Sequence, residues 1–182
     1  MSPKMNTNGE KIKEFKEILN PKENSFAEYT VTGSWKDNMT IDVQTHDIMF
    51  ADKVIKHQHL FKVDEPEELL GTGTAPTAQD YLMAGLAGSM LTTFATEASV
   101  RGVSISSLCL EIKGKLDLKA IHGIKRKVNP GFEKLEYRFV VESKASSTTI
   151  YEIANHVIFY SPIYATISKG ETEIVRRVEI VC

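Results

Sequence analysis

The residues from Thr77 to Gly102 decide the fold, and they read TAQDYLMAGLAGSMLTTFATEASVRG. This long apolar run, with small residues in its middle, predicts a buried central helix. Thr77, with Asp80 three residues later, approximates a capping box, the reciprocal pairing that begins many helices. Arg101 in the last turn and Gly102 directly after it are typical of a helix end.

Three segments before this helix carry the patterns of regular elements. Apolar residues at helical spacing indicate a helix, and alternating apolar and polar residues around a polar turn indicate a hairpin. The predicted elements are a helix at Gly9–Leu19, a hairpin at Phe26–Val43 and a strand at Lys53–Val63. His57 and His59 disturb the alternation of that strand.

The segments after the central helix complete the expected order of elements. They are a strand from Leu108 to Leu118, a basic irregular connection from Leu118 to Pro130, a strand from Leu135 to Val141, a helix from Ser147 and a closing strand over residues 174–180. Ser161 suits an N-cap and Pro162 the first helical position, so a short third helix is expected there. Strands and helices do not alternate regularly, and the fold class is therefore α+β.

Four segments in this order resemble motifs of the OsmC/Ohr family, which comprises osmotically inducible protein C-like and organic hydroperoxide resistance-like proteins. Phe61–Pro66 reads FKVDEP, Asp80–Ser89 reads DYLMAGLAGS and Ser161–Ile167 reads SPIYATI. The fourth segment is the step from Arg101-Gly102 into the strand at 108–117. The resemblance covers roughly Phe26 to Val181.

The resemblance implies an OsmC-like α+β fold with a strand-rich N-terminal part, a long buried central helix, and a second helix packed on an antiparallel sheet. It implies a helical extension at 1–25 and a single domain at 26–182, with a β lobe at 26–76 and a helix–sheet lobe at 77–182. Family members are typically intertwined homodimers with active sites at the subunit interface. The small residues of the central helix fit such an interface, although they also fit packing inside one subunit.

The family's chemistry is thiol peroxidase chemistry on organic hydroperoxides. A thiolate attacks the peroxide oxygen, and the sulfenic acid that forms condenses with a second thiol. By resemblance, Ser89 stands at the first cysteine, Ser161 near the second and Gln79 where a supporting carboxylate is expected. A serine hydroxyl cannot run this redox cycle, so we interpret Ser89, Ser161 and Gln79 as degenerate catalytic positions.

Two main functional hypotheses follow. The first is a family member that lacks thiol peroxidase activity and binds a small apolar ligand at the dimer interface. The second is an active antioxidant, hydroperoxide-detoxifying or hydrolytic enzyme at the same pocket, with Ser89 paired to a histidine or Cys109 acting as an unusual thiol. A structural or stress-associated dimer without a small ligand is the third hypothesis.

Other candidate residues favour structural roles. Cys109 shares a strand face with polar residues, and Cys182 is terminal. His57 and His59 lie two residues apart without the further ligands of a metal site, so we expect neither metal nor cofactor. Glu152 and His156, four residues apart, fit an ordinary surface pair on a helix.

Composition restricts the partners that we expect. The chain has 182 residues, of which 25% are charged, and its net charge is −2, which gives no electrostatic footprint for nucleic acid. The apolar run from Tyr81 to Phe94 is shorter than a membrane span, and the N-terminus has no apolar signal core. We expect a cytoplasmic homodimer that contacts a small hydrophobic ligand or an organic hydroperoxide, but neither nucleic acid nor a membrane.

Overall fold

The computed structural model describes residues 9–22, 24–51 and 53–170. The closing strand predicted over residues 174–180 lies outside these residues. The chain divides into two compact units, one formed by Glu10–Ala84 and the other by Gly9 and the residues from Gly85 onward. Each unit is described by itself below.

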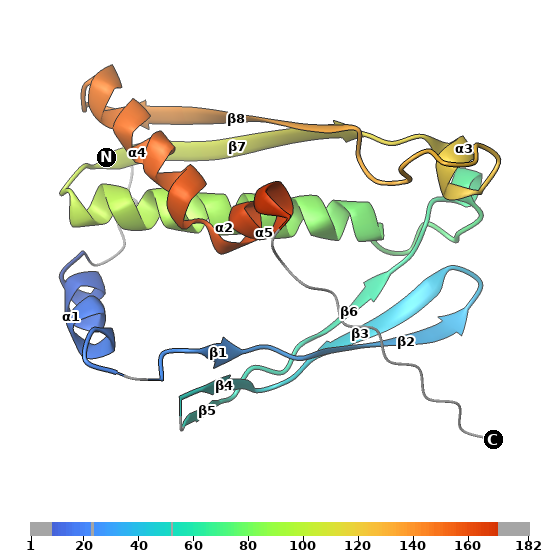
Figure 1. The fold of residues 1–182 in the computed structure, drawn as a ribbon, viewed down its shortest axis with the longest axis horizontal. Helices are drawn as coiled ribbons and strands as arrows, with labels where there is room; N and C mark the ends of the chain where they lie inside the picture. Colours follow the sequence, from blue (N-terminus) through green and yellow to red (C-terminus); the bar gives the residue numbers. More distant parts are fainter. Residues whose placement is uncertain (1–8, 23, 52, 171–182) are drawn as a thin grey trace. The chain divides into compact units, whose positions relative to one another are not determined.

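The first unit contains helix α1, the short 3-10 helix η1 at Glu67–Leu69, the start of α2 and two small antiparallel sheets (Figure 1). Helix α1 spans Gly9–Leu19, as predicted. One sheet has the order β1-β4-β5, formed by Ala27–Glu28, Ile48–Phe50 and Lys53–Ile55. The other has the order β2-β3-β6, formed by Val31–Asp37, Thr40–Thr45 and Leu60–Val63. The predicted hairpin is confirmed by the antiparallel pairing of β2 with β3.

The single strand predicted over Lys53–Val63 is wrong, because β5 and β6 belong to different sheets. Asp47 holds the chain between β5 and β6 in a conformation that does not continue the strand. Its carboxylate accepts hydrogen bonds from Lys56 Nζ at 2.7 Å, from His57 N at 3.2 Å and from Gln58 Nε2 at 3.0 Å. The three-residue strand β4 carries too short a pattern to be predicted.

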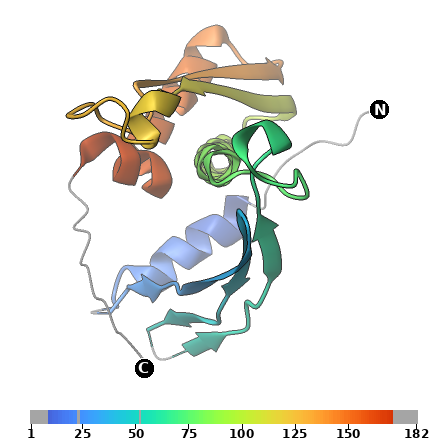
Figure 2. The ribbon, with the colours of Figure 1, turned by 90° about the vertical axis from the view of Figure 1, so that its right-hand side faces the viewer.

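The second unit packs a helix against a two-stranded sheet (Figure 2). Helix α2 spans Ala78–Val100 and begins in the first unit, and β7 at Ile105–Lys115 pairs with β8 at Lys134–Ser143. Helix α4 at Ser147–Tyr160 and helix α5 at Pro162–Lys169 follow. The predicted central helix, strands and final two helices are thereby confirmed. The core contains Leu86, Met90, Phe94, Ala98, Ile105, Ile153 and Val157.

The ends of two elements depend on local capping. Thr77 N donates to Asp80 Oδ2 at 2.9 Å and Asp80 N donates to Thr77 Oγ1 at 3.1 Å, so the predicted capping box forms with aspartate. Strand β7 ends at Lys115 and not at Leu118 as predicted. The carboxylate of Asp117 accepts from Lys119 N at 2.8 Å and caps α3, Leu118–Ile121, a short helix where we predicted irregular chain.

Candidate functional site

Ser89 and Ser161, which lie 72 residues apart in the sequence, are brought into contact within the second unit. The two Oγ atoms are 2.8 Å apart, which is a hydrogen bond in which either hydroxyl can donate. The N–H of Ile163 also points at Ser89 Oγ, at the longer distance of 3.4 Å. Ser89 is half-buried in α2 and Ser161 is completely buried.

Ser161 holds its place because it ends one helix and begins the next. Its N–H donates to Val157 O at 2.9 Å, which closes α4, and its Oγ faces Tyr164 N at 3.4 Å, which caps α5. Pro162 follows at the first helical position, where its missing N–H costs no hydrogen bond. The sequence therefore fixes the junction of α4 and α5 so that the Ser161 hydroxyl faces the middle of α2.

The hydroxyls of Ser89 and Ser161 have uncharged hydrogen-bonding partners within the described residues. Tyr164, on the first turn of α5, packs its ring edge-on against Tyr137 with centroids 6.1 Å apart. Burial raises the pKa of Tyr137, and Tyr164 raises it further. Tyr137 is therefore a neutral phenol at physiological pH.

Gln79 is not brought into this hydroxyl contact. It lies on the first turn of α2, ten residues before Ser89, which corresponds to about 15 Å of helix rise. Its Oε1 atom is buried and has no hydrogen-bond partner among the described residues. The structure thus offers a buried amide oxygen at this position where the family resemblance implies a carboxylate.

Three of the histidines considered as activators of Ser89, namely His156, His57 and His59, have other partners. His156 Nε2 lies 3.3 Å from Glu97 Oε2, and its ring stacks on Tyr160 with centroids 4.2 Å apart. His57 and His59 pack edge to face against each other, with centroids 4.7 Å apart. The hydroxyl of Ser161 and the N–H of Ile163, neither of which is a base, are the hydrogen-bonding partners that the described residues give Ser89 Oγ.

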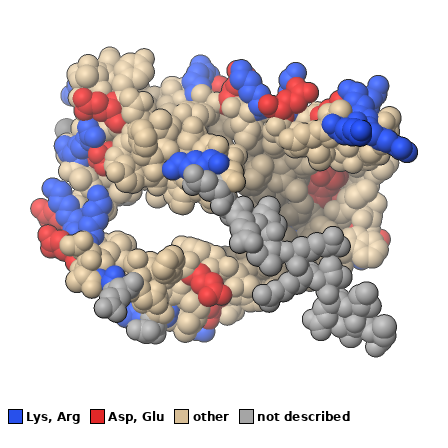
Figure 3. Space-filling view, viewed as in Figure 1, with Lys and Arg blue, Asp and Glu red and all other residues tan. Residues whose placement is uncertain are grey.

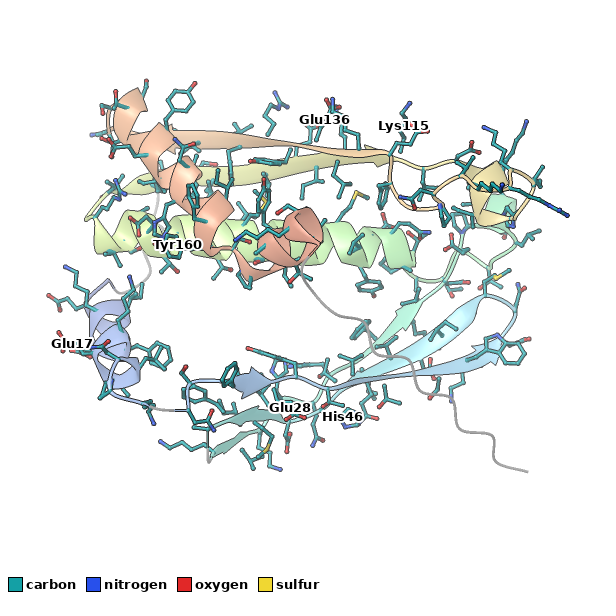
Figure 4. All side chains as sticks on the ribbon, in the orientation of Figure 1. Glu17, Glu28, His46, Lys115, Glu136 and Tyr160 are labelled. Carbon is teal, nitrogen blue, oxygen red and sulfur yellow. The ribbon has the colours of Figure 1, made fainter. Side chains whose placement is uncertain are left out.

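Cys109 occupies the exposed face of β7. Its neighbours Leu108 and Leu110 pack against the core, and side chains alternate between faces along a strand. Figure 4 shows Lys115, on the same face as Cys109, pointing away from α2. The thiol of Cys109 therefore points away from the serine pair of its own chain.

Ion pairs around Glu97 link α2 to α4. Glu97 Oε1 accepts from Arg101 Nε at 2.6 Å, and Arg101 Nη1 reaches Glu152 Oε2 at 2.8 Å. These bonds, of which the one to Glu97 is the strongest, raise the pKa of Arg101. The expected surface pairing of Glu152 with His156 is wrong, since both residues contact partners on or at the end of α2 instead.

Asp64 is a structural residue that the sequence analysis took only as part of a family motif. Its buried carboxylate accepts from Thr72 Oγ1 at 2.6 Å, Thr74 Oγ1 at 2.8 Å, Thr74 N at 3.0 Å and Glu65 N at 2.9 Å. The Thr72 hydroxyl, followed by the Thr74 N–H, lowers the pKa of Asp64 far below its usual range. A Cβ on Gly71 would lie 1.7 Å from Glu65 O, so this loop requires glycine there.

The described part of the chain holds no group of three or more His, Cys, Asp or Glu side chains arranged to bind a metal. No helix within it has the length and apolar character needed to cross a bilayer.

The family is established by a sequence model. The model described as OsmC-like protein matches residues 71–175, more than half of the chain, and the matched stretch contains both serines. The protein therefore belongs to the OsmC/Ohr family. A search of curated proteins gave no match.

Solved structures agree with this fold. An OsmC-like protein from Mycoplasma pneumoniae is 19% identical, with a TM-score of 0.62 over 79% of this chain and 89% of that chain. An OsmC-like protein of unknown function from Vibrio cholerae is 12% identical, with a TM-score of 0.54 over 78% and 94%. The organic hydroperoxide resistance protein OsmC from Legionella pneumophila is 17% identical, with a TM-score of 0.51 over 78% and 89%.

Proposed function

We propose that this protein is an OsmC-like family member without thiol peroxidase activity, which binds a small apolar ligand beside Ser89 and Ser161 in a homodimer. The observation that carries the proposal is the 2.8 Å contact between the two hydroxyls. It places serine oxygens side by side, as a reactive thiol and its resolving partner would have to lie. The scaffold is therefore retained while the redox atoms are absent from it.

The atoms at the site support the proposed loss of peroxidase chemistry. Peroxide reduction by a cysteine requires a thiolate that becomes a sulfenic acid and then a disulfide. Oxygen in a serine side chain cannot pass through that cycle. Cys109, the cysteine within the described residues, points to the opposite face of β7 and cannot replace Ser89 in its own subunit.

Hydrolysis is the weaker alternative, because Ser89 lacks the arrangement that activates a serine. A nucleophilic serine donates its proton to a base that a third group orients. Ser89 is paired instead with a second neutral hydroxyl. Two adjacent hydroxyls are suited to hold a polar end of a ligand by hydrogen bonds.

Apolar side chains next to the serine pair support a hydrophobic ligand. They flank Ser161 in the chain and remain partly or largely exposed, and they are Phe159, Tyr160, Ile163 and Ile167. Burying them against an apolar ligand or a second subunit would release about 25 cal/mol for each Å² removed from water.

The dimer is supported by surfaces that one chain leaves open. Gly85 and Gly88 are exposed, and a Cβ added at either would meet no heavy atom of the described chain within 4 Å. Packing inside their own unit therefore does not require glycine, whereas close approach of a second helix would. Strand β2 is exposed along its whole length, with Trp35 at 71%.

The first experiment measures consumption of cumene hydroperoxide with a dithiol reductant, with Cys109→Ala alongside. We expect no turnover above background in either protein. Turnover that disappears in Cys109→Ala would contradict the proposal and make Cys109 the catalytic thiol. Turnover that persists in Cys109→Ala would contradict it in favour of another reactive group.

A double variant tests whether the scaffold is intact. In Ser89→Cys/Ser161→Cys the two sulfurs would replace oxygens that are 2.8 Å apart, so we expect a disulfide on oxidation and a gain of peroxide reduction. Cys109→Ala and Cys182→Ala are included to remove thiol exchange. Two thiols that stay free after oxidation would show that the proposed equivalence of these positions is wrong.

The dimer is tested by filling the glycine surface. A Cβ at Gly88 would meet no heavy atom outside its own helix within 4 Å, so we expect Gly88→Leu to fold and to sediment as a monomer while the natural protein sediments as a dimer. Thr148→Leu, on the exposed side of α4, is the matched control and should leave the dimer intact. A natural protein that sediments as a monomer would refute this part of the proposal.

Ligand binding is tested with a fluorescent fatty acid. Ser89→Leu fills the space next to Ser161 and is expected to weaken binding about tenfold, because it removes a hydrogen-bonding group and occupies volume. Thr148→Leu, on the exposed side of α4, is the control. Equal affinity in Ser89→Leu and the natural protein would place the ligand elsewhere.

A further inference from the structure

Residues 118–130 form a loop, called the basic loop below, in which positive charge is concentrated. It contains Lys119, Lys125, Arg126 and Lys127 and no Asp or Glu, although the whole chain has a net charge of −2. In Figure 3 basic side chains gather at the end of the molecule that carries α3. The net charge of the whole chain, from which we expected no nucleic-acid partner, averages over this local excess, and the expectation of no membrane partner considered only a membrane-spanning segment.

Most of these cations are not neutralised by a neighbour. Lys125 pairs with Asp117, which lies just before the loop. Lys119, Arg126 and Lys127 make no ion pair within the described part of the chain. On the adjacent β7–β8 sheet, by contrast, Lys113, Lys115, Lys134 and Arg138 all pair with glutamates.

Aliphatic side chains lie among the free cations. Every residue from 121 to 130 is exposed, and the apolar members are Ile121, Ile124 at 72% and Val128 at 46%. Isolated exposed aliphatic residues are ordinary, but with Leu118 at 45% there are four of them in the basic loop, and they form a mixed surface with its cations.

Local hydrogen bonds hold the backbone of the first part of the basic loop, residues 118–125. Asp117 caps α3, Gly123 takes a left-handed conformation with φ of 68°, and Ile124 N donates to Lys119 O at 2.8 Å. Little backbone ordering is therefore needed on binding to present Lys119 and Ile124 together.

We propose that the basic loop docks this protein onto the surface of an anionic lipid bilayer. Lysine and arginine are drawn to the negative surface potential of such a bilayer, and aliphatic side chains enter the boundary between headgroups and acyl chains. Nucleic acid would use the cations but would gain nothing from Ile124 or Val128. The proposal does not depend on the serine pair or its ligand.

The test is co-sedimentation of the full-length protein with vesicles of phosphatidylglycerol and phosphatidylcholine in equal parts, at low salt. We expect binding that weakens as salt rises and that is lost on vesicles of phosphatidylcholine alone. Lys119→Gln/Arg126→Gln/Lys127→Gln should weaken binding roughly 100-fold, because each cation near the surface contributes about fivefold. The charge-matched control Lys53→Gln/Lys144→Gln/Lys169→Gln removes three exposed cations elsewhere and should change binding much less.

The aliphatic contribution separates lipid from other polyanions. Ile124→Asn/Val128→Asn leaves the charge unchanged and should weaken vesicle binding several-fold. Tyr151→Asn is the control and should not weaken binding, although Tyr151 is as exposed as Ile124, at 72%. Thermal unfolding of each variant checks that the loop changes leave the fold intact. Equal loss in the two lysine sets, no effect of Ile124→Asn/Val128→Asn, or no vesicle binding by the natural protein would each overturn the proposal.

Discussion

The two units of this protein bury their side chains very differently. The second unit encloses an apolar cluster in which Met90, Phe94, Ile153 and Val157 are completely inaccessible to water. In the first unit the buried residues are Val43 and the carboxylate of Asp64. One unit is thus held by apolar packing, and the other by strand pairing and a polar loop.

This difference indicates what each unit needs from its surroundings. Apolar burial is the main favourable term in folding, and a small sheet with one exposed face lacks it. The exposed Trp35 and Phe26 of the first unit are the side chains that a second subunit would cover. The contrast in burial therefore gives a stability argument for the proposed dimer.

The largest expected effect is on the core of the second unit. Phe94→Ala should lower the free energy of unfolding by about 3–5 kcal/mol, because it leaves a cavity beside Phe139, whose ring centroid is 5.2 Å away. Trp35→Ala should cost less than about 0.5 kcal/mol in a monomeric background such as Gly88→Leu. Urea unfolding of both variants in that background measures the difference, and equal costs would remove the contrast between the units.

A second prediction concerns the polar loop of the first unit. Asp64→Asn should lower the midpoint of thermal unfolding by roughly 5–10 °C at neutral pH, because the amide cannot accept all the bonds that Thr72 and Thr74 donate. Asp47→Asn, at a more exposed carboxylate, should cost less. A smaller effect of Asp64→Asn than of Asp47→Asn would show that the loop does not depend on its buried charge.

The pH dependence of Asp64 has a defined sign. Its pKa in the folded protein is lowered from an ordinary value of 3.8, so ionised Asp64 stabilises the fold fully above that pH. The stability is lost as pH falls below 3.8 toward the folded-state pKa. The difference in stability between the natural protein and Asp64→Asn should therefore shrink on acidification, and a difference that grows instead would be contrary to this assignment.

Local patterns predicted the elements that have strong periodicity or a cap. The capping box at Thr77 and the Ser161-Pro162 junction specify helix starts through bonds between near neighbours, so one sequence suffices to find them. The break between β5 and β6 could not be found in this way, because it depends on Asp47 reaching across a turn to Lys56 and His57. Contacts made across sequence distance leave little local signal.

The same distinction between local patterns and contacts across sequence distance applies to the candidate site. The resemblance singled out Ser89 and Ser161, but the hydrogen bond between them is a contact across 72 residues that no local pattern contains. The partners of His156 and Glu152 on α2 were missed for the same reason. Asp64 was visible as part of a motif, yet its role depends on two threonines in a loop that had no periodic signal.

The last prediction concerns the contact between α2 and Ser161, at the junction of α4 and α5. Ser161→Ala should cost about 1 kcal/mol, since it removes the cap of α5 and the partner of Ser89. Ser146→Ala removes the cap of α4, where Ser146 Oγ accepts from Thr149 N at 3.1 Å, but touches no second helix. If the contact with Ser89 is energetically real, a double-mutant cycle of Ser161→Ala with Ser89→Ala will show coupling, whereas Ser146→Ala and Ser89→Ala will add. Additive costs in both cycles would mean that the two hydroxyls are neighbours without a shared bond, and would weaken the argument that they form one ligand-holding pair.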